Sequence, residues 1–360
     1  MSRFHSLQIA EVRHETPDCV SVAFQVPKDQ MDHYQFTQGQ YLTLKTEIDG
    51  EEVRRSYSIC ASPFDQELRV AIKKVPGGKF STFANEKLQA GDSLEVMPPM
   101  GNFFTKLDSA HQKHYLGFAA GSGITPILSI VKTVLKTEPQ SHFTLFYGNR
   151  TVESIIFREA LEALKNEYLD RLTIHYLLSR EHPGSDLFYG RIDAQKCGVF
   201  FDRLIDTSTV DEVFLCGPET MIEAVKSSLT LQGVPKKNIH FELFFSASAE
   251  KAKQQRIDII QEDDSPESAT EVTILIDGNR QEFQMPNSRK SILDGAIEAG
   301  ADLPYSCKGG VCSTCRARLM EGEVDMPINY ALEEDELAAG YILTCQAHPK
   351  SDKIYVDFDA

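Results

Sequence analysis

Four cysteines near the end of the chain restrict its fold more than any other feature of the sequence. Cys307, Cys312 and Cys315 fall within the run YSCKGGVCSTC, and Cys345 follows after a further 29 residues. In the plant-type spacing of a [2Fe–2S] cluster, one loop supplies three ligands and the fourth comes from far along the chain. Tetrahedral zinc sites usually draw on two short knuckles instead. The spacing therefore predicts an iron–sulfur cluster held by these four cysteines.

The two glycines inside the loop support this interpretation. Backbone N–H groups around an anionic cluster must point inward at the sulfur atoms, and Gly309 and Gly310 permit the backbone angles that this requires. The alternatives are a structural zinc ion and a thioredoxin-like use of Cys312 and Cys315. The remaining four cysteines of the chain lack such spacing, and we expect them to be buried.

The composition indicates a folded protein of several domains. A chain of 360 residues is too long for one ordinary core, so we expect two or three. The chain has 37 Lys and Arg against 53 Asp and Glu, a net charge of −16. This charge argues against binding to nucleic acid, and it predicts that a charged partner would be basic. The first residues lack a signal-peptide core, and glycines and a proline interrupt the apolar segment 115–135. We therefore expect a soluble cytoplasmic protein that does not bind membranes.

Strand and helix patterns divide the chain into three domains and a linker. Residues 1–110 show short strand-like runs between turns, which predicts an antiparallel β-barrel. Residues 111–245 alternate apolar strands with amphipathic helices, which predicts an α/β domain with a parallel sheet. Residues 246–270 are polar and read as a linker. Residues 271–360 form the third domain, with a helix that Ser291 caps and Gly300 ends.

Charge is unevenly spread, because residues 271–360 carry about half of the net negative charge. A solvated surface and an acidic docking face explain this equally well, and the run LEEDEL (332–337) can simply favour the start of a helix. Both interpretations stay open at this point.

Two motifs in the first domain and two in the second have the features of nucleotide-binding segments. RSYS (55–58) ends an early strand, and GGKFSTF (77–83) places two glycines before a helix expected to open near Ser81. A helix start preceded by flexible backbone binds phosphate, and Lys79 adds charge. GSGITP (121–126) and CGP (216–218) follow apolar strands, at the edge of a parallel sheet where ligands bind. Taken singly, each motif is a weak signal.

Three arginines follow the ends of predicted strands: Arg150 in YGNR, Arg180 in LLSRE and Arg191 in YGRI. Planar guanidinium groups suit a phosphate monoester, here the 2′-phosphate that separates NADPH from NADH. Taken alone, each arginine is better explained as a solvated surface residue, so the prediction depends on the three together.

The order RSYS, GG-K-F-S, GSGITP and CGP resembles that of the ferredoxin–NADP reductase superfamily. The stretches GADLPYSCKGGVCSTC and NYALEEDELAAGYILTCQA resemble the reductase subunits of phenylacetyl-CoA epoxidases, which add a plant-type ferredoxin domain. The resemblance covers nearly all of the chain. It implies a flavin-binding barrel, an NAD(P)-binding α/β domain and a β-grasp ferredoxin domain. It also implies an oxidoreductase that passes electrons from NADPH through FAD and a [2Fe–2S] cluster to an oxygenase or epoxidase component.

The resemblance also implies roles for single residues. Those expected at the flavin are Arg55, Ser56, Tyr57, Ser58, Gly78, Lys79, Phe80 and Ser81. Those expected at the nicotinamide are Gly121, Gly123, Thr125, Cys216 and Gly217. Those expected to favour NADPH are Arg150, Ser179, Arg180 and Arg191. The catalytic set would be Tyr57, Ser58, Thr125 and Cys216. Glu242 and Phe244 lie near the flavin in relatives, although a terminal apolar strand explains HFELF equally well.

Two other functions stay open. The chain could be the reductase component of a different aromatic-ring oxygenase, hydroxylase or desaturase, because the substrate of the partner never touches this subunit. It could also be a non-catalytic redox or metal-binding module with a vestigial flavin site. The sequence does not specify an oligomeric state.

Overall fold

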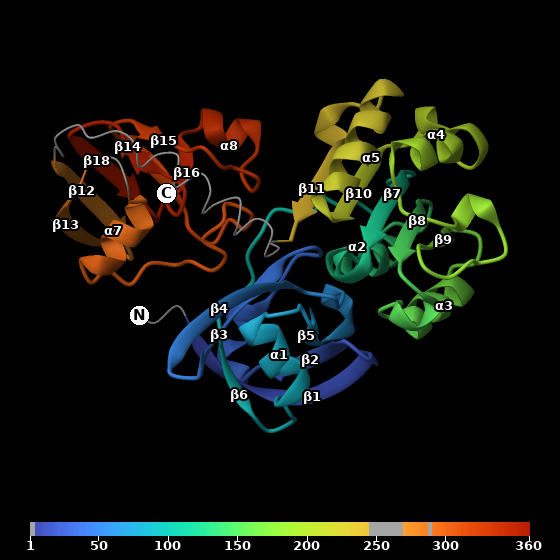
Figure 1. Cartoon of the computed structure of the whole chain (residues 1–360), viewed down its shortest axis with the longest axis horizontal. Helices are drawn as coiled ribbons and strands as arrows, with labels where there is room; N and C mark the ends of the chain where they lie inside the picture. Colours follow the sequence, from blue (N-terminus) through green and yellow to red (C-terminus); the bar gives the residue numbers. More distant parts are fainter. Residues whose placement is uncertain (1–3, 245–268, 287–289) are drawn as a thin grey trace. The chain divides into compact units, whose positions relative to one another are not determined.

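The computed structural model describes residues 4–244, 269–286 and 290–360, which belong to two compact units (Figure 1). The first unit is Phe4–Phe244 and holds two sheets. The second unit contains the described residues from Ala269 onward. Most of the predicted linker, residues 246–268, lies outside the described residues, and Ala269 already begins a strand.

The first sheet of the larger unit is antiparallel and has six strands in the order β4-β3-β6-β1-β2-β5. Among the described residues the ladder does not close into a continuous barrel, but its two edges meet at a single bridge between Ile59 and Val70. Apolar residues such as Leu42 and Val22 fill its core, against which helix α1 (Lys79–Glu86) packs. The strands are β1 His5–Thr16, β2 Cys19–Gln25, β3 Tyr41–Ile48, β4 Glu51–Ser58, β5 Leu68–Lys73 and β6 Ser93–Val96.

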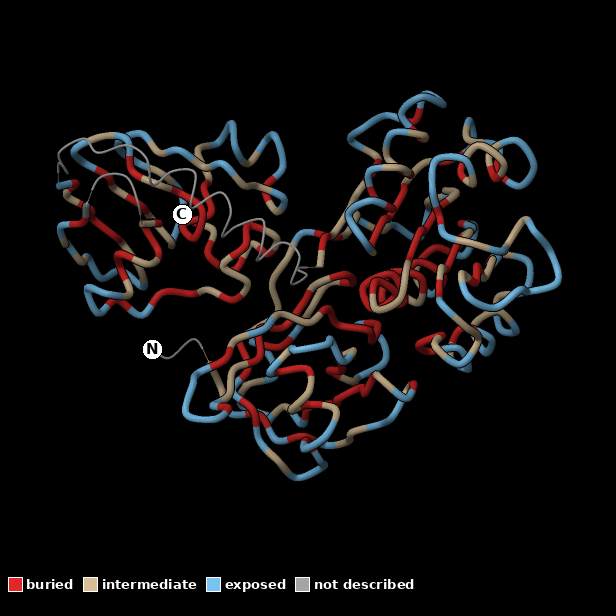
Figure 2. The backbone as a smooth tube through the Cα atoms, in the orientation of Figure 1, coloured by how far each residue is buried: buried red, intermediate tan, exposed pale blue. Residues whose placement is uncertain are grey.

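The second sheet is parallel throughout and has the order β11-β10-β7-β8-β9. The three central strands β10, β7 and β8 are mostly apolar and buried, as expected for a sheet covered on both faces, whereas the edge strands β11 and β9 are only partly buried (Figure 2). The strand order reverses between β7 and β10, which makes their carboxyl ends the natural ligand-binding edge. The strands are β7 His114–Ala120, β8 His142–Asn149, β9 Leu172–Leu178, β10 Glu212–Gly217 and β11 Ile239–Leu243. The helices are α2 Ile124–Thr137, α3 Arg158–Glu167, α4 Ala194–Arg203 and α5 Glu219–Leu231.

Helix α2 joins the two sheets of this unit through polar contacts. Ser129 Oγ donates to the carbonyl of Ala61 at 2.6 Å, and Lys132 Nζ pairs with Asp65 at 2.8 Å. The Ser129 contact is buried. Breaking a buried hydrogen bond is costly because the donor and the acceptor are left without each other and without water. The loop after β4 is therefore fixed against the helix that follows β7.

The C-terminal unit has a mixed sheet in the order β13-β12-β18-β14-β16, with β12 and β18 parallel. Ser291 accepts a hydrogen bond from the Asp294 N–H at the start of α7, and Gly300 has φ +85° just after the helix, so the predicted cap and stop are confirmed. The larger elements are β12 Ala269–Ile276, β13 Asn279–Pro286, α7 Ile292–Glu298, β14 Arg316–Glu321, β16 Tyr341–Leu343 and β18 Lys353–Asp357. The smaller ones are β15 Val324–Asp325, α8 Glu334–Ala338 and β17 His348–Pro349.

Two hairpins, one in each unit, turn at an Asp-Gly pair. Asp49 and Gly50 join β3 to β4, and Asp277 and Gly278 join β12 to β13, all four with positive φ. This backbone matches the right-handed twist of antiparallel strands, and Asp-Gly is a favoured sequence for it. The registers of both hairpins are thus set locally.

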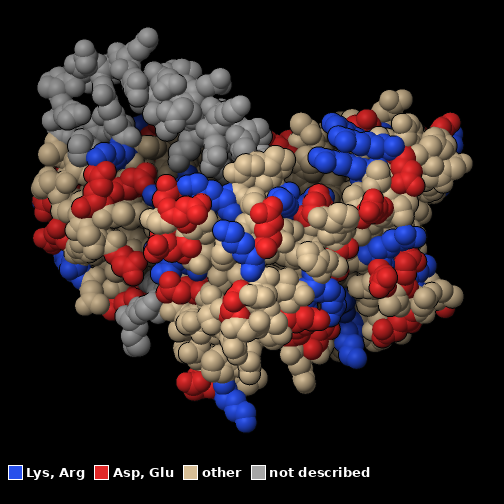
Figure 3. All heavy atoms as spheres, turned by 60° about the horizontal axis from the view of Figure 1, so that its bottom comes forward, with Lys and Arg blue, Asp and Glu red and all other residues tan. Residues whose placement is uncertain are grey.

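Acidic and basic side chains are interspersed on the face that Figure 3 shows. None of the helices in the described ranges combines the length and apolarity needed to cross a membrane.

Candidate functional site

The predicted flavin segments RSYS and GGKFSTF lie side by side. Tyr57 is on β4 and Phe80 is on α1, and their ring centroids are 5.5 Å apart. Burial raises the pKa of the Tyr57 hydroxyl, so it stays protonated. Ser56 Oγ lies 3.2 Å from Thr43 Oγ1 on the neighbouring strand, whereas Arg55 is exposed and donates to the Arg54 carbonyl at 2.7 Å. The end of β4 and the start of α1 therefore form one surface.

Helix α1 begins at Lys79, two residues before the start that we expected near Ser81. The reason is that Ser81 does not cap the helix. Its Oγ accepts a hydrogen bond from Val75 N–H at 3.1 Å in the preceding turn, and Gly78 occupies the cap position. A Cβ on Gly78 would lie 2.5 Å from Ser81 Oγ, so this position needs glycine.

The start of α1 leaves backbone donors available for an anion. The first intrahelical bond runs from Thr82 N to Gly78 O at 3.0 Å, so the helix itself does not use the preceding N–H groups. Lys79 is exposed beside them and pairs with Glu51. Together with the helix dipole, these donors favour a phosphate group.

The two glycine turns of the second sheet meet at the carboxyl ends of β7 and β10. Gly121 has φ +55°, and its carbonyl accepts a hydrogen bond from Tyr147 OH at 3.0 Å. Gly123 approaches the end of β10 so closely that a Cβ would lie 2.1 Å from the Cys216 carbonyl oxygen. At Gly217 a Cβ would lie 2.7 Å from Met221 Cε, the end of a flexible side chain, so this position is less restricted. The close contact at Gly123 therefore holds the two turns against each other.

A half-buried polar contact connects this edge to the flavin strand. Ser58 Oγ donates to Glu242 Oε2 at 2.9 Å, and Glu242 pairs in register with Cys216 on the next strand. Burial raises the pKa of Glu242 to about 7, although the hydrogen bond from Ser58 works in the opposite direction. Burial also raises the pKa of the Cys216 thiol well above its ordinary value, so it stays neutral. Thr125 Oγ1 donates to the Ser122 carbonyl at 3.0 Å.

Glu242 therefore belongs with the residues expected at the flavin and nicotinamide. The sequence placed it there only by resemblance and left a plain apolar strand as an equal explanation. Its contact with Ser58 bridges 184 positions of sequence and has no local signal. Phe244, also named from the resemblance, is partly buried against the core of the same unit.

The three arginines come together at the carboxyl ends of β8 and β9. The backbone N–H of Arg180 donates to the Arg150 carbonyl at 2.8 Å, and Ser179 N donates to the Asn149 carbonyl at 2.9 Å. Arg191 directly follows Gly190, whose N–H donates to the carbonyl at the end of β9. All three arginines are exposed, and their side chains make no hydrogen bond or ion pair with other residues in the described part of the chain. Their positive charge is therefore available to a ligand at this edge.

The four predicted cluster cysteines also come together. The sulfur atoms of Cys307 and Cys312 are 3.1 Å apart, and Cys345 contacts the sulfurs of both Cys307 and Cys315. Hydrogen bonds from Cys312 and Cys345, with backbone donors nearby, hold the pKa of the Cys307 thiol well below its ordinary value. The backbone N–H of Gly309 lies 3.3 Å from the Cys307 sulfur. Convergent thiols with inward-pointing N–H donors fit an anionic iron–sulfur cluster.

The loop conformation differs from our expectation in one respect. Gly310 has φ +73° as expected, but the other positive angle is at Lys308 (φ +50°) rather than at Gly309. A Cβ on Gly310 would lie 3.0 Å from the Ile328 carbonyl oxygen. Apart from these four cysteines, no group of three His, Cys, Asp or Glu side chains among the described residues is spaced to hold a metal ion.

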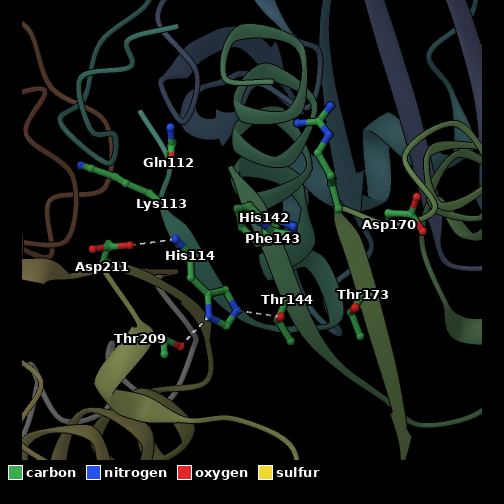
Figure 4. Close-up of a pocket in the computed structure, with 11 residues that line it drawn as sticks. Gln112, Lys113, His114, His142, Phe143, Thr144, Asp170, Thr173, Thr209 and Asp211 are labelled. Carbon is green, nitrogen blue, oxygen red and sulfur yellow. Dashed lines mark hydrogen bonds between the residues drawn. The ribbon is translucent and has the colours of Figure 1, made fainter. Parts of the chain in front are cut away.

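A hollow of about 410 Å³ opens at the opposite, amino-terminal edge of β7, β8 and β9 (Figure 4). His114 lies across it, with Nε2 3.0 Å from Thr144 Oγ1 and Nδ1 3.2 Å from Thr209 Oγ1. The His114 backbone N–H donates to Asp211 at 2.8 Å. These polar groups satisfy one another, and none of the sequence motifs reaches this edge.

A flavin-type antiparallel sheet, a parallel sheet with a glycine-lined edge and a four-cysteine loop together define an electron-transfer reductase. The chain matches the oxidoreductase FAD-binding domain over residues 6–105, the oxidoreductase NAD-binding domain over 118–227 and the 2Fe-2S iron-sulfur cluster binding domain over 274–350. FAD, a nicotinamide nucleotide and a [2Fe–2S] cluster are thus its cofactors, and it is an oxidoreductase.

Full-length relatives specify the family further. The chain is 46% identical to a subunit of 1,2-phenylacetyl-CoA epoxidase from Escherichia coli (strain K12), over 100% of this chain and 99% of that protein. It is 34% identical to the ferredoxin reductase component of 3-ketosteroid-9-alpha-monooxygenase from Rhodococcus rhodochrous, over 99% and 97%. It therefore belongs to this family of reductase components. The crystal structure of phthalate dioxygenase reductase shares the fold, with a TM-score of 0.58, 24% identity and coverage of 99% and 98%.

Proposed function

We propose that this chain transfers electrons from NADPH, through FAD and its [2Fe–2S] cluster, to the oxygenase component of a phenylacetyl-CoA epoxidase. The observation that carries the choice of partner is the 46% identity to a subunit of that epoxidase along the whole chain, against 34% to a ketosteroid monooxygenase reductase. A cytoplasmic location belongs to the same proposal.

Bound FAD would supply acceptance of two electrons from the nicotinamide and their release one at a time, which is the form that an iron–sulfur cluster carries. We assign the flavin phosphates to Arg55 and to the backbone donors and Lys79 at the start of α1. Tyr57, packed against Phe80, would support the flavin ring. Its neutral hydroxyl adds no charge to the site.

We assign the nicotinamide to the edge formed by Gly121, Gly123 and Gly217, where the absence of side chains leaves the backbone open to a flat ring. Thr125 and Cys216 border this edge, and both are buried. The neutral Cys216 thiol and the hydrogen-bonded pair Ser58–Glu242 would place weakly charged groups beside the reacting ring. Such groups orient the ring and exclude water without competing for the hydride.

We assign the 2′-phosphate of NADPH to Arg150, Ser179, Arg180 and Arg191. The support is that three exposed guanidinium groups without partners among the described residues lie where two neighbouring strands end. Guanidinium groups bind phosphate monoesters through paired hydrogen bonds. The four cysteines would hold the cluster as thiolates.

An anaerobic spectrum tests the electron path, and reconstitution tests the partner. We expect flavin and iron–sulfur absorption that both bleach when NADPH is added. A protein that stays colourless after reconstitution with flavin, iron and sulfide would overturn the oxidoreductase assignment and favour a zinc-binding module. With the path intact, the phenylacetyl-CoA epoxidase oxygenase should support substrate-dependent NADPH oxidation. A ketosteroid monooxygenase that does so instead would reject the proposed partner.

A further inference from the structure

The residue after the last cluster cysteine, Gln346, is buried with 3% of its surface exposed. Its side-chain nitrogen donates to the carbonyl of Lys308 and to the carbonyl of Cys345, both at 2.9 Å. The same nitrogen lies 3.7 Å from the Cys345 sulfur. One amide group therefore contacts the loop beside the first cysteine and the sulfur of the last.

The contact with Lys308 falls where the loop is most strained. Lys308 has φ +50°, a conformation that costs energy for a residue other than glycine and persists only where its surroundings hold it. Its ammonium group pairs with Asp294 at 2.8 Å, and its carbonyl accepts the Gln346 amide. A Cβ on Gly310 would lie 3.1 Å from Gln346 Cγ, so the glutamine stem also packs over the loop. Gln346 thus braces the loop from the opposite side.

From this geometry we propose that Gln346 is a positioning residue of the iron–sulfur site, which fixes the Lys308 turn and donates toward the Cys345 sulfur, and thereby raises the reduction potential of the cluster. This inference rests on the proposed ligation by the four cysteines. The family match names the cluster domain but assigns no role to this glutamine.

The direction of the effect follows from charge. Reduction adds one electron to an already anionic cluster, so N–H donors aimed at its sulfur ligands stabilise the reduced form more than the oxidised form. Burial strengthens such contacts because little water competes with them. The amide nitrogen has two hydrogens for three acceptors, so the contact with sulfur is shared with a carbonyl. We therefore expect about a tenfold change in the equilibrium constant for cluster reduction, which is about 59 mV for a one-electron couple.

The test is a potentiometric titration of full-length holoprotein with the substitution Gln346→Met, followed by visible and EPR spectroscopy. Methionine keeps the length of the side chain and removes both N–H donors. We expect the cluster to become about tenfold harder to reduce, with the flavin reduced by NADPH as in the unmodified protein. The matched control is Gln281→Met in β13, where the amide is exposed and donates to the Ala299 carbonyl.

The iron and sulfide content is measured first on the unmodified protein. This measurement separates the ligation of the cluster by the four cysteines from the role proposed for Gln346. An unmodified protein that binds no cluster refutes the four-cysteine ligation itself. If the Met variant loses its cluster, the same potentiometric titration is done on Gln346→Asn. Asparagine keeps a polar amide but is too short to reach the Lys308 carbonyl, so this cluster too should be harder to reduce. A cluster of unchanged potential in either variant, or no cluster in both, would overturn the proposed tuning role.

Discussion

Gly123 lies where the start of α2 meets the end of β10, and we predict that replacing it with alanine disrupts the nucleotide edge. Its φ is −61°, so alanine would fit the backbone conformation without strain. Alanine also favours a helix over glycine by about 1 kcal/mol. Any loss must therefore come from space, and a Cβ here would lie 2.1 Å from the Cys216 carbonyl oxygen and 3.0 Å from the Gly217 nitrogen.

The distance gives the size of the effect. Ordinary Cβ contacts begin at 3.4 Å, so the start of α2 and the end of β10 must separate by more than 1 Å. Both partners are backbone, which cannot rotate away as a side chain can. Overpacking of this kind costs about 1–3 kcal/mol, and we expect a value at the upper end. A displacement of about 1 Å at a reacting ring can slow a reaction by about 100-fold.

The assay is anaerobic stopped-flow reduction of FAD by NADPH, together with denaturant unfolding. The matched control is Gly198→Ala in α4, where a Cβ would meet no atom within 4 Å. It should gain up to about 1 kcal/mol of stability and reduce the flavin at the normal rate. If Gly123→Ala is as stable as this control and equally fast, the glycine turns do not form the nucleotide edge, and the site has to be sought elsewhere.

Three further predictions concern the same electron path. The pKa of Glu242 is raised from 4.5 to about 7, so the folded state loses stability as the pH rises from about 4.5 through 7. The variant Glu242→Gln has no carboxyl group to ionise at this position and should escape this loss, which amounts to up to about 3 kcal/mol at pH 8. Denaturant unfolding of both proteins at pH 5 and pH 8 measures the difference. Parallel stability curves for the two proteins would contradict the raised pKa. Arg180→Ala should raise the KM for NADPH about tenfold or more while changing that for NADH little, whereas Arg203→Ala, at the end of α4, should change neither. Equal effects on both nucleotides would rule out a 2′-phosphate contact. Cys312→Ser should abolish reduction of the cluster and leave flavin reduction by NADPH intact, with Cys197→Ala as the control thiol outside the loop. Loss of flavin reduction in the serine variant would mean that the order of transfer is different.

Local patterns were enough to predict much of the architecture. The change from strand-rich to alternating sequence separated the antiparallel sheet from the parallel one. Ser291 and Gly300 marked the two ends of α7, and the spacing of the four cysteines indicated their convergence. Each of these signals acts over a few residues, or depends on a chemistry that few side chains share. They can be read from the sequence because the physical cause is itself local.

Local reading failed where a neighbour along the chain was not the neighbour in space. A helix start was expected near Ser81, whereas α1 begins at Lys79 and the Ser81 hydroxyl accepts a hydrogen bond from the Val75 N–H in the preceding turn. Gly309 seemed the residue suited to an unusual backbone angle, but the loop places that angle at Lys308, which Gln346 and Asp294 hold from outside.

Strand and helix patterns thus predicted the order of the domains, and cysteine spacing predicted the iron–sulfur cluster, whereas FAD was implied only by the resemblance to a known family. The strand order β11-β10-β7 decided that Glu242 and Cys216 share an edge with Gly123, and the packing of β4 against that edge brought Ser58 to Glu242. The pKa of Glu242 is raised because that packing partly withdraws its carboxyl group from water. Burial and strand order arise from the whole folded chain, so no short stretch of the sequence can specify them.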